Sequence, residues 1–255
     1  MRPVLEGKVV LVTGGAGGIG TASCTVLAEA GARIVVSDIA VEAGEAVAEG
    51  LRAGGHDATF VPADLSTEAA IEGLVAAAVA HYGRLDGAFN NAGMEQHNTP
   101  LEELTLAQWD SVIRIDLTAV FLCIKHQVRA MLLTGGGAIA NMASGLGQIA
   151  IPNAAEYVAA KHGVIGVTRA AAADFGARGI RVNAILPGIV RTPMIERLSS
   201  EPSFSQHVEK LRMRHLMQRF AEPREIGEAA KWLLSDGASF VNGIALPVDG
   251  GALAN

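Results

Sequence analysis

Tyr157 and Lys161 are four positions apart in a stretch with helical periodicity, so their side chains project from one helix face about one turn apart. A tyrosine hydroxyl has an unperturbed pKa of about 10 and is an effective base near neutral pH only where a cation favours its ionised form. Ser144 precedes this pair and could donate a hydrogen bond to an oxygen that gains charge. A Tyr-x-x-x-Lys pair alone is common on protein surfaces, so the surrounding motifs decide whether it carries chemistry.

A glycine-rich run at residues 13–20, Thr-Gly-Gly-Ala-Gly-Gly-Ile-Gly, lies between the first predicted strand and the first predicted helix. Glycine lets the backbone approach a pyrophosphate closely, and a helix N-terminus offers free N–H groups. Asp38 ends the second predicted strand, where a carboxylate can accept hydrogen bonds from adenosine ribose hydroxyls. It would repel a 2′-phosphate, and Ile39 rather than a basic residue follows it, so NAD is favoured over NADP. The alternatives are an ordinary tight turn and a solvated aspartate.

The elements that must position these residues alternate along the chain. Short β-branched runs are separated by alanine-rich stretches with helical periodicity, which is the pattern of βαβ units and a parallel sheet. The seven predicted strands cover residues 9–13, 33–37, 58–62, 85–90, 137–142, 180–186 and 244–248. The first helix is predicted over residues 21–30, and capping-box spacing marks two further helix starts, Thr105 with Gln108 and Asn153 with Glu156. The predicted fold is α/β, with one doubly wound parallel sheet.

Composition favours one large domain over residues 1–255. Half of the residues are apolar, and the 30 glycines come with only 9 prolines, which excludes collagen-like and disordered classes. The net charge of −6 argues against a nucleic-acid partner. The longest apolar run, residues 74–80, is too short to span a membrane, so we expect a cytoplasmic protein with no membrane partner. No metal-ligand spacing occurs, and Cys24 and Cys123 are expected to be buried free thiols.

Together these motifs resemble the short-chain dehydrogenase/reductase family over essentially the whole chain. The motifs that carry the resemblance are residues 13–20, 90–93 (Asn-Asn-Ala-Gly), Ser144, Tyr157 with Lys161, Pro187-Gly188 with Thr192, and 249–251 (Asp-Gly-Gly). The resemblance implies strand order 3-2-1-4-5-6-7, hydride transfer between a nicotinamide and a secondary alcohol or ketone, and commonly a homotetramer. It implies Tyr157 as the general acid/base. The expected cofactor-binding residues are Gly14, Gly17, Gly18, Ile19, Asp38, Ile39, Asp64, Leu65, Asn91, Ala92, Gly93, Tyr157, Lys161, Pro187, Gly188, Val190 and Thr192.

One position departs from the family pattern. Relatives usually carry asparagine as a fourth catalytic residue where this chain has Asp116. A charged Asp116 about 6 Å from Tyr157 or Lys161 would interact with it by roughly 3 kcal/mol at an effective dielectric constant of about 20. We hypothesise that Asp116 opposes the effect of the lysine on the tyrosine and shifts the pH profile of alcohol oxidation to higher pH. The alternative is a structural aspartate, paired with Arg114 or with a backbone donor.

The substrate is expected to contact the least regular segments, residues 94–98, 145–155 and 189–222, and the last of these is predicted to form a substrate-binding loop or lid. Their side chains are mostly apolar, which favours a hydrophobic or cyclic alcohol. The apolar residues are Met94, Leu146, Ile149, Ile151, Met194, Leu198, Phe204, Met213, Leu216, Met217 and Phe220. Two other functions share the motifs. Asp38 argues against a 3-oxoacyl-carrier-protein reductase, because those enzymes mostly use NADPH, and the intact serine, tyrosine and lysine argue against a non-catalytic NAD-binding sensor.

Overall fold

The computed structural model of the chain describes residues 3–192, 195 and 202–254. Its centre is a seven-stranded sheet in the order β3-β2-β1-β4-β5-β6-β7, and every pair of neighbouring strands is parallel. The strands are β1 (Val9–Thr13), β2 (Arg33–Asp38), β3 (Ala58–Pro62), β4 (Gly87–Asn90), β5 (Gly137–Met142), β6 (Ile180–Pro187) and β7 (Ala245–Val248). The predicted strands, their parallel arrangement and their order are confirmed, with ends that differ by one or two residues.

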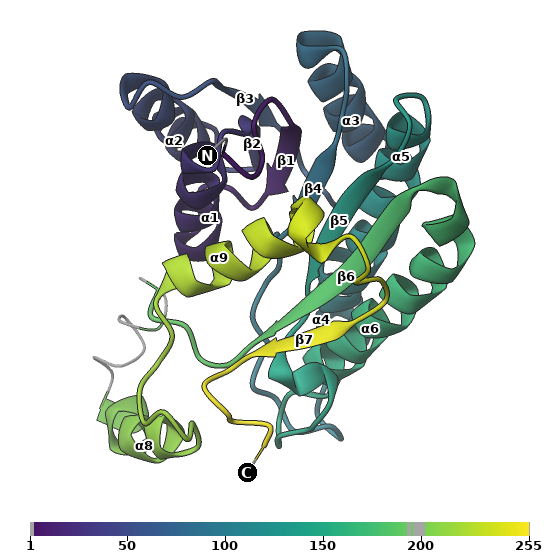
Figure 1. Cartoon of the computed structure of the whole chain (residues 1–255). Coiled ribbons are helices and arrows are strands. Elements are labelled where there is room, and N and C mark those ends of the chain that lie inside the picture. The colour runs from purple at the N-terminus through teal and green to yellow at the C-terminus, as the bar shows by residue number, and fades with distance from the viewer. Residues whose placement is uncertain (1–2, 193–194, 196–201, 255) are drawn as a thin grey trace.

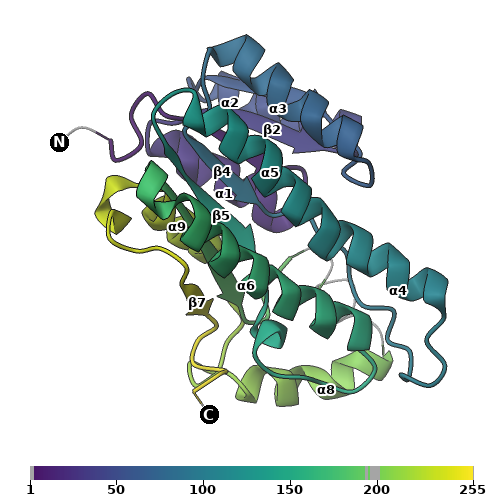
Figure 2. The ribbon, with the colours of Figure 1, turned by 90° about the vertical axis from the view of Figure 1, so that its right-hand side faces the viewer.

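Helices cover both faces of the sheet (Figures 1 and 2). One layer contains α1 (Gly18–Glu29), α2 (Val41–Ala53) and α9 (Pro223–Leu234), and the other contains α3 (Glu68–Tyr82), α5 (Ala119–Leu132) and α6 (Ala155–Phe175). Side chains of β1 alternate between the two cores, because successive residues of a strand point to opposite faces. Val10 and Val12 pack in the core beneath the first layer, and Val9 and Leu11 pack in the other. Burial on both faces explains why the strands are continuous apolar runs.

The two predicted capping boxes have different outcomes. Helix α4 (Leu106–Ile113) begins after Thr105, and the reciprocal bonds between Thr105 and Gln108 confirm the first. The second is wrong, because α6 begins after Ala154 and its N-cap side chain makes no hydrogen bond. Asn153 has a φ of +61°, a left-handed conformation that asparagine tolerates but an N-cap residue does not adopt. The Glu156 side chain takes no part in a helix cap. Its buried carboxylate instead accepts a hydrogen bond from the backbone N–H of His97 in a loop.

Two further expectations concern the helices. Helix α1 begins at Gly18, three residues before the predicted start, because the last glycines of the run enter its first turn. Cys24 and Cys123 are buried free thiols, as predicted, and burial raises the pKa of each to about 12. In the described part of the chain, no helix is long and apolar enough to cross a membrane.

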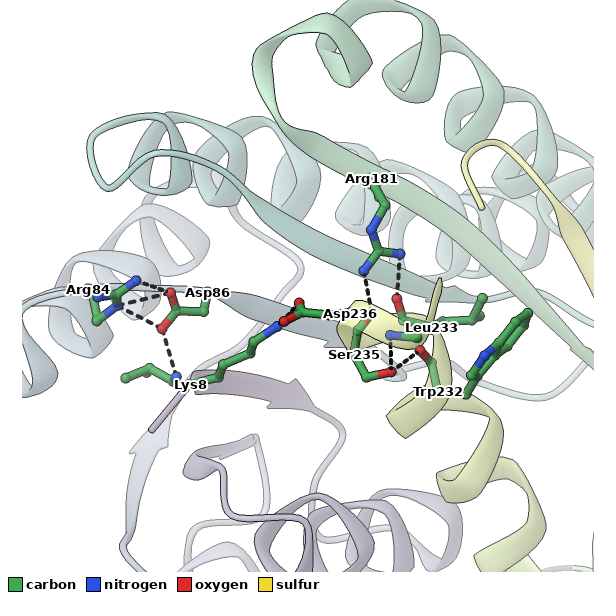
Figure 3. A network of polar contacts seen from close by, with 10 residues as sticks. Lys8, Arg84, Asp86, Arg181, Trp232, Leu233, Ser235 and Asp236 are labelled. Carbon is green, nitrogen blue, oxygen red and sulfur yellow. Dashed lines mark hydrogen bonds and ion pairs between the residues drawn. The ribbon is translucent and has the colours of Figure 1, made fainter. Parts of the chain in front are cut away.

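Polar side chains tie the elements together at the amino ends of the strands (Figure 3). Asp86, immediately before β4, accepts a hydrogen bond from the backbone N–H of Val9 at 2.9 Å and pairs with Arg84. Lys8, immediately before β1, pairs with Asp236, which follows α9. These contacts connect β1, β4 and the segment after α9 at the amino ends of the strands. The glycine-rich run lies at the opposite, carboxyl ends.

Candidate active site

A cavity of about 630 Å³ opens at the carboxyl ends of β1, β2 and β4. The strand order reverses between β1 and β4, which is the position where open α/β sheets bind ligands. Predicted cofactor-binding residues in its wall are Gly14, Gly17, Gly18, Ile19, Asp38, Ile39, Asp64, Leu65, Asn91, Ala92, Gly93 and Thr192. The wall also contains Ala16, Gly20, Ser37, Ala63 and Ile115, whereas Tyr157, Lys161, Pro187, Gly188 and Val190 are outside it.

The glycine-rich run forms a cradle of bare backbone at this cavity. Gly14 has a φ of +63°, and a Cβ there would lie 2.8 Å from the Cα of Ala92. A Cβ on Gly20 would lie 1.9 Å from the carbonyl oxygen of Gly14. Helix α1 begins at Gly18 in the same wall, and the first N–H groups of a helix have no partner within it. A tight backbone turn against a helix N-terminus fits a pyrophosphate group.

Asp38 lies between the glycine-rich run and the start of α2. Its Oδ2 accepts a hydrogen bond from the N–H of Ala16, and its Oδ1 accepts one from the N–H of Ala40, both at 3.0 Å. A carboxylate has about four acceptor positions, so two remain for hydroxyl groups of a ligand. Asp64 adds a second carboxylate to the wall, and a hydrogen bond from the N–H of Ser66 lowers its pKa. None of the residues that line the cavity in the described part of the chain is a lysine or arginine.

Asn91 holds the glycine-rich run in place. Its Nδ2 donates hydrogen bonds to the carbonyl oxygens of Thr13 and Gly14 at 3.1 and 3.0 Å. The Thr13 hydroxyl oxygen in turn accepts the N–H groups of Asn91 and Ala92. These contacts join the ends of β1 and β4, so the Asn91 amide supports the cradle while the residue lines the cavity.

Tyr157 and Lys161 lie one turn apart on α6, with the lysine Nζ 5.2 Å from the centroid of the tyrosine ring. The lysine is buried, and its Nζ is 3.4 Å from the carbonyl oxygen of Met142 at the end of β5. Burial lowers the pKa of Lys161, but attraction to Tyr157 and Asp116 and a hydrogen bond to Asp116 outweigh it, and the net shift is upward. The lysine therefore remains a cation beside the tyrosine.

Asp116 is the buried partner of this lysine. It belongs to a π-helical segment, Arg114–Thr118, between α4 and α5, and such insertions are frequent at functional sites. Its Oδ2 lies 3.1 Å from the Lys161 Nζ, and its Oδ1 accepts the N–H of Met94 at 2.8 Å. The separation is therefore shorter than the 6 Å considered above, and no ion pair joins Asp116 to Arg114, although the structure describes both. A backbone donor and a charged partner both hold the carboxylate.

Gly93 connects the cavity to this ion pair. It lines the cavity wall, and a Cβ there would lie 3.4 Å from the Asp116 Oδ1 and 3.5 Å from the Lys161 Nζ. The cavity and the ion pair between Asp116 and Lys161 therefore meet at this glycine.

Ser144 follows β5 and begins the short helical turn Gly145–Gly147. Its Oγ accepts a hydrogen bond from the N–H of Leu146 at 3.1 Å, which leaves the hydroxyl hydrogen available for another acceptor. Leu253 lies close by, because its side chain is 3.9 Å from the position of a Cβ on Gly145. The Asp249 carboxylate holds this C-terminal turn through the N–H groups of Gly251 and Leu253. The sequence did not indicate Leu253 as a neighbour of Gly145, the residue after the serine.

The described parts of residues 189–222 are anchored near the cavity. Val190 is buried and forms a β-bridge to Ala221. The N–H of Ile189 donates to the Nε2 of His215 at 3.1 Å, and His215 also fills the space beside Gly188. Helix α8 (Pro202–Met213) lies beyond the carboxyl ends of β6 and β7, near the C-terminus (Figures 1 and 2). The predicted substrate residues Met194 and Leu198 lie outside the described residues.

A buried polar cluster beneath the site was not indicated by the sequence. The Asn90 amide, at the end of β4, exchanges hydrogen bonds with Gln127 of α5 and donates to Asn141 of β5. Asn141 donates in turn to the hydroxyl of Thr168 on α6. The cluster links β4 and β5 to α5 and to α6, the helix that carries Lys161.

Comparison with known proteins agrees with this architecture. A protein-family model described as "Enoyl-(Acyl carrier protein) reductase" matches residues 14–252. The chain belongs to the short-chain dehydrogenase/reductase family. The enzyme is 46% identical over 252 residues to 2,5-dichloro-2,5-cyclohexadiene-1,4-diol dehydrogenase of Sphingobium indicum, with 98% of each chain covered. It is 44% identical over 247 residues to cis-4-hydroxycyclohexanecarboxylate dehydrogenase of Sinomonas cyclohexanicum, with 97% of each chain covered.

A solved structure of levodione reductase superimposes on the enzyme with a TM-score of 0.92. The two are 38% identical, and the match covers 98% of this chain and 99% of the other. Membership of the family and these relatives show an oxidoreductase that binds a nicotinamide cofactor and acts on secondary alcohols or ketones.

Proposed function

We propose that this dehydrogenase uses NAD rather than NADP and interconverts a cyclic secondary alcohol and its ketone. The observation that carries the cofactor preference is the Asp38 carboxylate at the cavity, together with a described wall free of lysine and arginine. An anionic wall repels a 2′-phosphate and accepts hydrogen bonds from a free ribose. The substrate class is supported by the cyclic compounds in the names of the two relatives described above.

In the proposed mechanism, Tyr157 is the general base for oxidation. Its ionised oxygen takes the hydroxyl proton of the alcohol while the carbonyl bond forms, and the nicotinamide cofactor, when bound, accepts the hydride from the same carbon. The Lys161 cation favours the ionised tyrosine, and Ser144 donates a hydrogen bond to the substrate oxygen as its charge changes. In the direction of reduction, the tyrosine hydroxyl returns its proton to the carbonyl oxygen.

The last residue of β6 and the segment after it complete the proposed site. We assign Pro187, Gly188, Val190 and Thr192 to the nicotinamide half of the cofactor, and residues 189–222 to a substrate-binding loop. The presence of Thr192 in the cavity wall and the bond from Ile189 to His215 support this assignment.

The cytoplasmic location and the homotetramer stay predictions. Two aromatic side chains support an assembly, because Phe240, between α9 and β7, is fully exposed and Trp232, on α9, is 40% exposed. Exposed aromatic side chains of this kind are typical of protein interfaces.

The test is a comparison of kcat/KM for cyclohexanol and cyclohexanediols with NAD and with NADP. We expect NAD to be preferred by at least about tenfold, which corresponds to roughly 1.4 kcal/mol, and we expect Asp38→Ser to reduce that preference. Linear 2-alkanols and a 3-oxoacyl thioester are the comparison substrates. Preferred turnover of the thioester with NADPH would replace the proposal with the carrier-protein reductase.

A further inference from the structure

Glu156 is a fully buried carboxylate immediately before Tyr157 on α6. Its Oε1 accepts a hydrogen bond from the backbone N–H of His97 at 2.8 Å. Its Oε2 is buried with no hydrogen-bond partner, and no lysine, arginine or histidine forms an ion pair with it, as far as the described residues extend. Burial of such a group costs free energy unless its contacts compensate, so its one strong contact needs an explanation.

The hydrogen bond between His97 and Glu156 is one of two that fix residues 94–97. Residues 94–97 leave the cavity wall after Gly93 and contain no helix or strand. At the first residue, the N–H of Met94 donates to Asp116, the partner of Lys161. At the last, the N–H of His97 donates to Glu156. The segment therefore runs from the group that pairs with the lysine to the residue beside Tyr157, and a buried carboxylate holds each end.

The two anchoring carboxylates, Asp116 and Glu156, differ in their other contacts. Asp116 also forms the ion pair with Lys161, so its removal would disturb the proposed proton-transfer groups directly. Glu156 has the loop as its described partner, so its removal would disturb the loop first. The position of an irregular segment depends on such anchoring bonds, because no ladder or helix of its own satisfies its backbone groups.

From this arrangement we propose that Glu156 is a positioning residue for the alcohol substrate. It sets the conformation of residues 94–97 beside Tyr157 and so determines the KM for the alcohol, whereas the cofactor cradle is held independently by Asn91 and Thr13. The inference rests on the proposed function, because it assigns the loop to the alcohol that Tyr157 would deprotonate.

The first test compares Glu156→Ala with Glu156→Gln. The glutamine keeps an oxygen that can accept the N–H of His97, whereas alanine removes the acceptor. We expect alanine to raise the KM for the alcohol by about tenfold or more, on the scale of the losses that follow small displacements of positioning groups, with a smaller change in kcat. Glutamine should restore most of the KM, and the Kd for NAD should stay within about twofold of wild type in both. Glu68→Ala, which also removes a glutamate from the first turn of a helix, is the matched control.

The second test removes the donor and leaves α6 untouched, so it decides the question even if Glu156→Ala fails to fold. His97→Pro eliminates the backbone N–H, whereas His97→Ala keeps it. His97→Pro should raise the KM more than His97→Ala does. Equal KM values for these two variants, or a wild-type KM in Glu156→Ala, would overturn the proposal. An equal KM increase in Glu156→Ala and Glu156→Gln would also overturn it, because the charge rather than the anchoring bond would then be responsible.

Hydrogen exchange separates this inference from the proposed function. The amide of His97 should be protected in the wild-type enzyme and exchange at least about tenfold faster in Glu156→Ala, whether or not cyclohexanol is turned over. Inactive wild-type enzyme with this difference would contradict the substrate class and support the anchor. Active wild-type enzyme without the difference would contradict the anchor alone.

Discussion

At the amino ends of the strands, Lys8 pairs with an Asp236 side chain that is 88% exposed, whereas at the carboxyl ends the Lys161 and Asp116 side chains are 3% and 0% exposed. Exposed pairs contribute up to about 1 kcal/mol to stability. Removal of one partner from a buried pair costs about 3–5 kcal/mol, because it leaves an uncompensated charge. A lysine–aspartate pair therefore contributes little to stability at the amino ends of the strands. At the carboxyl ends, loss of one partner would be strongly destabilising.

The polar groups around the two ion pairs also differ in how completely they are hydrogen-bonded. At the amino end, Arg181 donates to the carbonyl oxygens of Leu233 and Ser235 at 2.7 and 2.9 Å, which ties β6 to the end of α9 (Figure 3). At the carboxyl end, Glu156 keeps a buried oxygen without a hydrogen-bond partner among the described residues, and the glycine-rich run leaves its backbone open to a cavity. The polar side chains at the amino ends therefore have partners within the fold, whereas groups at the carboxyl ends remain available to contact other molecules or positions of the chain. Variants at the two ends should therefore separate stability from activity.

Tyr157→Phe should show the largest effect, and only on activity. Removal of the hydroxyl eliminates the proposed general base, so kcat should fall by at least about 10²-fold. The free energy of unfolding and the Kd for NAD should change little, because the aromatic ring remains. Steady-state kinetics, urea unfolding and a fluorescence titration with NAD measure the three quantities. Turnover close to that of the wild type would exclude Tyr157 as the base.

Asp86→Ala should show the opposite behaviour. Its carboxylate accepts the N–H of Val9 and pairs with Arg84, and its side chain is 10% exposed. The loss of hydrogen bonds to a charged group should lower the free energy of unfolding by about 2 kcal/mol, with kcat/KM per folded enzyme unchanged. Asp236→Ala is the matched control at the same end and should cost less than about 1 kcal/mol in urea unfolding. A fall in kcat/KM for Asp86→Ala without a loss of stability would contradict the division between the two ends.

The alternation of strands and helices could be predicted because it follows from local periodicity. Strands buried on both faces must be apolar throughout, and the helices between them must carry an apolar face. The position of the cavity proposed for the cofactor could be predicted for a related reason, since glycines after a first strand mark a backbone that a side chain would obstruct. Gly14 and Gly20 bear this out, because added Cβ atoms would clash with neighbouring backbone.

Contacts between segments distant in the chain could not be predicted. The same capping-box spacing gives a box at Thr105 and none at Asn153, because the backbone at Asn153 is left-handed and Glu156 turns to His97, 59 positions away. The family pattern places Asp116 near the proposed catalytic pair, but spacing alone does not show that it binds Lys161 directly. These differences arise where tertiary contacts with a loop outweigh a local preference.

Asp116→Asn tests how the buried pair acts on the tyrosine, and the shift in the pH profile should be the smallest of the three effects in free energy. The aspartate contributes to the raised pKa of Lys161, and its negative charge offsets part of the field of that lysine at Tyr157. Without the charge, the lysine should favour ionised tyrosine more strongly. The midpoint of the pH profile of kcat/KM for oxidation should therefore move to lower pH by about 0.5 unit or more, which corresponds to roughly 0.7 kcal/mol.

The same variant has a predictable effect on stability at high pH. A lysine whose pKa is raised on folding contributes stability that is fully present below its unfolded value of about 10.4 and is lost as the pH rises through the folded value. Asp116→Asn reduces the upward shift, so urea unfolding near pH 7.5 should show a larger loss relative to wild type than unfolding near pH 10.5, where the wild type itself begins to lose this contribution. Asp110→Asn, an exposed aspartate on α4, is the control and should change neither profile. An unchanged oxidation profile in Asp116→Asn would restrict the aspartate to a structural role, in which its bond to Met94 positions the loop without altering the charge at the tyrosine.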